Sequence, residues 1–166
     1  LCAYFLCIFR IAYFAGARKN RLVYGKRKST GVKTVADVNA SESRVLCRRC
    51  EHYEDDKTLL LFVREAFALF GFDAAALAGK RVAIKPNLVM KAEPSRAATV
   101  HPALMRAVLT VLDEAQCADV VIAESCGGPF HAAALGPVYR ATGMTEAAQG
   151  HQVRLNDDFT AAHVPY

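Results

Sequence analysis

Two polar turns, each directly after a short apolar run, hold the residue types of this chain that are best suited to chemistry. The first turn carries Lys85 and Asn87 and lies in residues 81–89, RVAIKPNLV. The second carries Glu124 and lies in residues 120–130, VVIAESCGGPF. Such apolar runs are typical of buried parallel strands, and open α/β sheets bind their ligands beyond the carboxyl ends of the strands. We therefore expect both turns to face one crevice.

The first turn has the side chains that an anion-binding site needs. Lys85 supplies a positive point charge, Pro86 constrains the turn, and Asn87 offers both donors and acceptors. A carboxylate or phosphate ligand fits this chemistry. The alternative is structural: Lys85 pairs with a nearby acid, and Asn87 satisfies the backbone of the turn.

The second turn adds backbone donors and a carboxylate. Gly127 and Gly128 allow the backbone to approach a ligand closely, and successive N–H groups from Ser125 onward can form an anion-binding nest. Glu124 can bind a metal or act as a general base, or it is simply capped or paired within a tight turn. Neither G-x-G-x-x-G nor G-x-x-x-x-G-K-[ST] occurs here, so the turn is not a known nucleotide fingerprint. His101 precedes a predicted helix and either reaches the crevice as a ligand or only caps that helix.

The cysteines do not predict a metal centre within this chain. Cys47 and Cys50 form a C-x-x-C pair, which is either a redox or metal motif or two ordinary thiols whose spacing on a strand points them to opposite faces. Cys126, before the two glycines, is either a reactive thiol or a passive one. The run C-x₂-C-x₂-C-x₃-C-P that binds bacterial iron–sulfur clusters is missing from the sequence. We therefore predict no metal ligands and no cofactor in these residues.

The elements that position the two turns alternate between strand and helix along the chain. This order predicts the α/β class: a three-layer, open, mostly parallel sheet with helices on both faces, incomplete within these residues. Asp55 or Asp56 should begin the first helix and Gly71 should end it, while Pro102 should begin the second. The expected strands are 43–50, 81–85, 119–123 and 152–155, and the expected helices are 56–70, 102–115 and 135–148.

Charge divides the chain into two parts. Its 166 residues suffice for one domain with a core, and the net charge is +5. Residues 1–42 hold eight Lys or Arg against two acidic residues, whereas residues 43–166 are almost neutral. Because the basicity lies in the first part alone, we expect no nucleic-acid partner. We interpret 1–42 as an apolar and then basic leader or linker outside the fold, and 43–166 as the N-terminal part of the α/β domain.

The apolar run at the start of the leader raises the question of a membrane. Leu1–Ala17 is at the lower limit of length for a membrane span, and Arg10 at its centre costs about 2.5–3.5 kcal/mol on insertion scales. The basic residues follow this run, whereas a secretory signal carries them before it. We expect a cytoplasmic protein, which contacts a membrane only if Leu1–Ala17 is an anchor on the cytoplasmic side.

Four ordered motifs carry a resemblance to a known family. They are IKPNLV at 84–89, VHPAL at 100–104, AESCGGP at 123–129 and VYRATGM at 138–144. Together they resemble the bacterial and archaeal family called domain of unknown function 362, over about residues 43–166. Many members carry a ferredoxin-like module with two 4Fe–4S clusters further along the chain, so the resemblance implies that this chain is an N-terminal fragment of such a protein.

Two functions follow as expectations. In the first, this is a domain of an iron–sulfur redox-type protein that binds an anionic or metal-linked ligand at the strand ends. In the second, it is a non-catalytic binding or scaffold module that positions a redox partner. The candidate ligand-binding residues are Lys85, Asn87, His101, Glu124, Ser125, Gly127 and Gly128. The family resemblance names no reaction, so we assign no catalytic residue.

Overall fold

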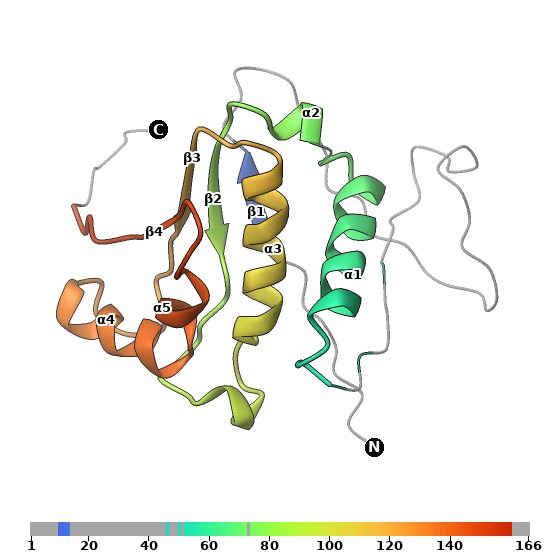
Figure 1. Cartoon of the computed structure of the whole chain (residues 1–166). Coiled ribbons are helices and arrows are strands. Elements are labelled where there is room, and N and C mark those ends of the chain that lie inside the picture. Colours follow the sequence, from blue (N-terminus) through green and yellow to red (C-terminus); the bar gives the residue numbers. More distant parts are fainter. Residues whose placement is uncertain (1–9, 14–45, 47–49, 51, 73, 161–166) are drawn as a thin grey trace, which may run out of the picture.

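A computed structural model describes residues 10–13, 46, 50, 52–72 and 74–160 (Figure 1). Its sheet has the strand order β1-β2-β3-β4. Strands β2, β3 and β4 are parallel, and β1 pairs antiparallel with β2. The predicted α/β class with an open, mostly parallel sheet is confirmed. The strands are β1 (Arg10–Tyr13), β2 (Arg81–Lys85), β3 (Asp119–Ile122) and β4 (Arg154–Leu155).

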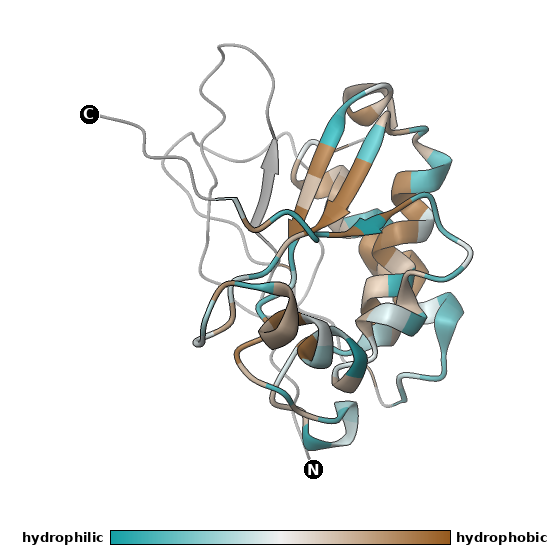
Figure 2. Ribbon diagram, turned by 90° about the vertical axis from the view of Figure 1, so that its left-hand side faces the viewer, coloured by the Kyte–Doolittle hydropathy of each residue, from teal (hydrophilic) through white to brown (hydrophobic). Residues whose placement is uncertain are grey.

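Alternating burial shows which face of the central strands is covered. Val82 and Ile84 of β2 are buried, and so are their register partners Val120 and Ile122 of β3. The residues between them are only partly buried. Successive side chains of a strand point to opposite faces, so one face of the sheet lies against the core. Figure 2 shows the apolar colouring of the central strands beside the helices.

Helix α1 (Asp56–Leu69) begins and ends where the sequence predicts. Asp55 is the N-cap: its carboxylate accepts hydrogen bonds from the Thr58 backbone N–H at 3.0 Å and from the Thr58 hydroxyl at 2.5 Å. These bonds hold the pKa of Asp55 below its usual value. The helix stops before Gly71, which adopts φ +76°, a conformation that glycine takes at little cost.

Helix α3 (Pro102–Glu114) is the centre of the helical layer. Its buried residues cover more than a single stripe at helical spacing, and Val111 is partly buried. The buried residues are Ala103, Leu104, Met105, Ala107, Val108, Leu109 and Leu112. The wider buried surface has a simple cause: α3 packs against α1 as well as α5 (Met144–Ala147). These helices supply one of the two predicted helical layers, and the second layer stays a prediction. Two short elements complete the architecture, α2 (Ala74–Leu77) and the 3-10 helix η2 (Pro94–Arg96).

The single helix predicted over 135–148 is two helices. Helix α4 (Ala132–Ala141) ends at Thr142, and α5 follows after Gly143, which has φ +74°. A left-handed residue cannot continue an α-helix, so the chain turns at Gly143. The turn brings α5 against the start of α3, where Pro102 contacts the position that a Cβ of Gly143 would occupy.

Several sequence predictions fall wholly or partly outside the described residues. Most of the strand expected at 43–50 lies there; its two described residues, Leu46 and Cys50, are not in a strand. Within the segment 1–42 the structure describes only β1, which pairs with β2. The interpretation of the segment as a leader or linker stays a prediction. Among the described residues, no helix has the length and apolar composition needed to cross a membrane.

We expect Gly143→Ala to destabilise the fold by about 2 kcal/mol or more, because an alanine pays for positive φ and its Cβ would lie 2.9 Å from Pro102 Cγ. Gly150→Ala is the matched control, since Gly150 has φ +80° but nothing within 4 Å of its Cβ position. Urea unfolding of both variants measures the difference. Equal losses would show that the contact with Pro102 carries no energy.

Candidate anion-binding site

The two polar turns lie side by side at the carboxyl ends of β2 and β3. The Ala123 N–H donates to the Ile84 carbonyl at 2.9 Å, which continues the strand pairing into the second turn. Further on, the Gly127 N–H donates to the Val89 carbonyl at 3.4 Å. The two turns that the sequence predicts to face one crevice are therefore adjacent, and the crevice itself stays a prediction.

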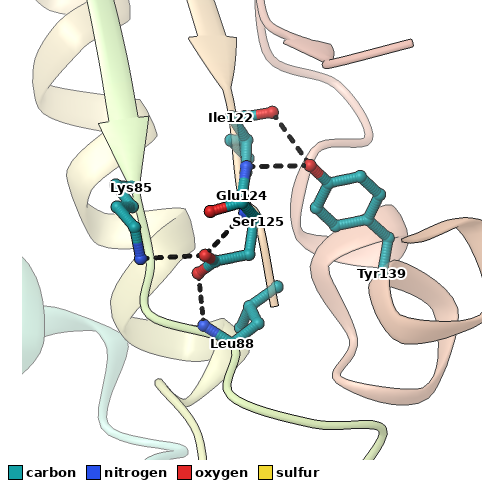
Figure 3. Close-up of polar contacts among 6 residues, drawn as sticks. All are labelled: Lys85, Leu88, Ile122, Glu124, Ser125 and Tyr139. Carbon is teal, nitrogen blue, oxygen red and sulfur yellow. Dashed lines mark hydrogen bonds and ion pairs between the residues drawn. The ribbon is translucent and has the colours of Figure 1, made fainter. Parts of the chain in front are cut away.

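Glu124 joins the two turns through a buried carboxylate (Figure 3). One carboxylate oxygen, Oε1, lies 2.8 Å from Lys85 Nζ and accepts the Ser125 N–H at 2.8 Å. The other, Oε2, accepts the Leu88 N–H at 2.5 Å. Only 2% of the Glu124 side chain is exposed. A buried carboxylate is stable only when paired and hydrogen-bonded, and these three donors meet that need.

Tyr139 hydrogen-bonds to the backbone at the end of β3, a role that the sequence did not predict. Its hydroxyl accepts the Glu124 N–H at 3.2 Å and faces the Ile122 carbonyl, as a donor, at 3.4 Å (Figure 3). Burial raises the pKa of this phenol, with a further rise from the charge of Glu124, although the hydrogen bond from Glu124 opposes the shift. The available signal was its position four residues after buried Leu135 on α4, which places both on one helix face.

Lys85 and Asn87 remain accessible beside this buried bridge. The Lys85 side chain is 48% exposed although its ammonium contacts Glu124. Asn87 is exposed and adopts φ 59°, the left-handed region that asparagine tolerates better than most residues. Pro86 between them is buried. The first turn therefore presents one charged and one amide side chain to solvent.

The second turn presents backbone to solvent and leads into a helix. Ser125, Gly127 and Gly128 are exposed, and Cys126 between them is partly buried. A Cβ on Gly128 would meet nothing within 4 Å, and one on Gly127 only the Val89 carbonyl oxygen at 3.9 Å. The α4 helix that follows has His131 at its N-cap but no side-chain cap hydrogen bond. Its first N–H groups therefore retain their partial positive charge.

His101 serves as the N-cap of α3. Its Nδ1 accepts the Ala103 N–H at 3.3 Å, and its ring stacks on Tyr53 with centroids 3.8 Å apart. Burial lowers the pKa of His101, and the positive charge of Arg106 lowers it further, while Glu54 opposes the shift. The capping alternative named from the sequence is therefore observed, and a ligand role for His101 stays a prediction.

The described cysteines do not gather into a centre. Cys50, Cys117 and Cys126 are free thiols, and burial raises the pKa of Cys117. Cys47 lies outside the described residues, so the C-x-x-C pair cannot be placed. In the part of the chain that the structure describes, no three His, Cys, Asp or Glu side chains are grouped to hold a metal. An iron–sulfur cluster needs four such ligands, so the described residues do not fit one.

Sequence comparison decides the family. Residues 82–166 match the family described as Domain of unknown function (DUF362). The chain belongs to this family. The match to DUF362 includes both turns, α3, α4 and α5, whereas the motifs suggested a resemblance from about residue 43. A comparison with curated proteins gives no match, and neither does a comparison with solved structures.

We expect Glu124→Gln to destabilise the protein by about 3 kcal/mol, because it removes a buried charge partner and turns an amide NH₂ toward backbone donors. Lys85→Met should cost about 1–2 kcal/mol, since Lys85 is half exposed and Glu124 keeps two N–H donors. The control is Arg81→Met at the other end of β2, whose 79% exposed side chain lies 3.6 Å from Asp119; we expect a loss within about 0.5 kcal/mol. Chemical denaturation measures the unfolding free energy of all three variants. Three equal losses would contradict a stabilising role for the contact between Lys85 and Glu124.

His101 predicts a pH dependence of stability. Its folded pKa lies below the ordinary value of 6.5, so the neutral ring caps α3 above about pH 6.5 and this contribution is lost as the pH falls through the folded pKa. Protonated Nδ1 cannot accept the Ala103 N–H. We expect wild type to lose up to about 1 kcal/mol more than His101→Asn between about pH 7.5 and pH 5, because Asn caps without titrating in this range. Parallel losses in thermal or urea unfolding would rule out this cap.

Proposed function

We propose that this DUF362 domain binds a small anionic ligand, free or linked to a metal, at the carboxyl ends of β2 and β3. The observation that carries the proposal is the half-exposed side chain of Lys85, whose ammonium contacts Glu124 at the strand end. An ammonium has three N–H donors. Its contact with Glu124 Oε1 fixes its position and leaves donors for a second acceptor.

The second turn supports the same site from the end of the neighbouring strand. Neither Gly127 nor Gly128 has positive φ, and a Cβ would be crowded at neither position, so the described fold does not require glycine there. The remaining reason for glycine at these two positions is the close approach of a ligand to the backbone. The N-terminus of α4 follows this turn and adds partial positive charge, as in other strand–turn–helix anion sites.

The geometry favours a positioning role for Glu124. Both of its oxygens accept hydrogen bonds from the protein, and the side chain is almost fully buried. A general base needs access to the proton that it removes. Glu124 instead orients Lys85 and fixes the backbone at Leu88, so the ligand is contacted by Lys85, Asn87 and the glycine turn.

The redox part of the proposal rests on family membership. The motifs that resemble domain of unknown function 362 imply an iron–sulfur protein with its 4Fe–4S clusters elsewhere than in the described residues. In this proposal the domain holds an anionic substrate for that redox chemistry, within a cytoplasmic protein. No step of a reaction is assigned to the residues of this site.

A non-catalytic binding or scaffold module is the second candidate. The observation that favours it is the internal pairing of Glu124, the one buried acid among the described residues, whose two oxygens are both occupied by donors of the protein. Under this alternative the turns hold a redox partner protein, and the domain has no affinity for small anions.

Titration of the chain with inorganic phosphate, followed through backbone amide resonances, separates the two candidates. The first predicts shifts at Gly127, Gly128 and the first turn of α4, and an affinity at least about tenfold weaker in Lys85→Gln. Arg81→Gln, at the far end of β2, should leave the affinity unchanged. Phosphate shifts that are absent, or equal in wild type and Lys85→Gln while both are folded, would refute the anion site.

A further inference from the structure

Exposed apolar side chains gather on the same chain segments as the anion site. Four large hydrophobic residues of the described chain are exposed, and three of them follow strand ends: Val89 at 51%, Met90 at 57% and Phe130 at 44%. The fourth, Leu61, lies on α1. Burial is the normal state of such side chains beside a core, so three on two short segments require a reason.

The hydrogen bonding brings these segments together. Val89 accepts the Gly127 N–H, so Val89 and Met90 stand beside the glycine turn that ends at Phe130. Phe130 is held edge to face against Phe159, with ring centroids 5.1 Å apart. Phe159 belongs to the segment after β4, and Asn156 of that segment donates to the Ile122 carbonyl at 2.8 Å. The segments after all three parallel strands therefore contribute apolar side chains at the carboxyl edge of the sheet.

The contact with Phe159 orders the Phe130 ring at this edge of the sheet. An aromatic pair at this separation contributes beyond its buried area, and it fixes the Phe130 ring while leaving 44% of the residue open to solvent. An oriented, half-open ring at the same edge of the sheet as a charged group suits a molecule with one polar and one apolar end.

We infer that the ligand of this site is amphipathic: a carboxylate or phosphate attached to an apolar body of ring size. The anionic group meets Lys85 and the glycine turn, and the apolar body lies on Met90, Val89 and Phe130. This inference rests on the proposed anion site and adds the class of ligand. The charge of Lys85 argues for a small anion over a second copy of the chain, which would bring a like charge to the same place.

The test compares inorganic phosphate with phenyl phosphate on the full chain at about pH 8, where both probes carry nearly two negative charges. We expect phenyl phosphate to bind about tenfold more tightly, because part of its ring leaves water on Met90 and Phe130. Met90→Ser and Phe130→Ser should each remove most of this preference and leave phosphate affinity unchanged. Leu61→Ser is the matched control, being equally apolar and exposed but on α1, and it should change neither affinity.

The outcomes separate the inference from the anion site beneath it. Equal binding of both probes, with no effect of Met90→Ser or Phe130→Ser, overturns the amphipathic ligand and leaves the anion site standing. Binding of neither probe overturns both. If the chain self-associates in sedimentation and Phe130→Ser abolishes that association while the probe preference persists, the apolar side chains serve a second copy and the inference is wrong.

Discussion

The carboxylate of Glu124 is the constraint on which the described site depends. Burial of this carboxylate is costly unless its oxygens are paired and hydrogen-bonded. The donors come from both turns: Lys85 and the Leu88 N–H from the first, and the Ser125 N–H from the second. The same carboxylate therefore fixes the backbone after β2 and the ammonium beside it. Tyr139 completes the arrangement by holding the Glu124 N–H from α4. Removing the charge would weaken the bonds that hold both turns.

This buried pairing separates the residue that positions the site from the residues that would contact a ligand. Glu124 lies inside, whereas Lys85, Asn87 and the glycine turn lie at the surface. A half-exposed lysine without such a partner would sample many rotamers and lose entropy on binding. The bridge restricts Lys85 before any ligand arrives. The exposed ring of Phe130 is restricted in the same way, by its contact with Phe159. Both ends of the proposed ligand would thus meet side chains that are already oriented.

The sequence predicted local features well and long-range pairing less well. Asp55, Gly71 and Pro102 act within one turn of their helices, so their roles follow from local chemistry. The strand ends were visible because apolar runs break abruptly into polar residues. The choice between ligand contact and internal pairing at Glu124 depends on atoms 36 to 39 residues away, and no spacing rule encodes it. The sequence predicted one helix over 135–148 and not the turn at Gly143, where the chain packs closely against Pro102 of α3.

Amide hydrogen exchange at Leu88 tests the bridge most directly. This N–H belongs to a turn and has a single acceptor in the structure, the Glu124 carboxylate. If the bridge organises the site, Leu88 and Ser125 should exchange slowly in wild type, and both should exchange faster in Glu124→Ala while the β2 and β3 amides remain protected. A Leu88 amide that exchanges at the rate of an unstructured peptide in the wild-type protein would contradict the account.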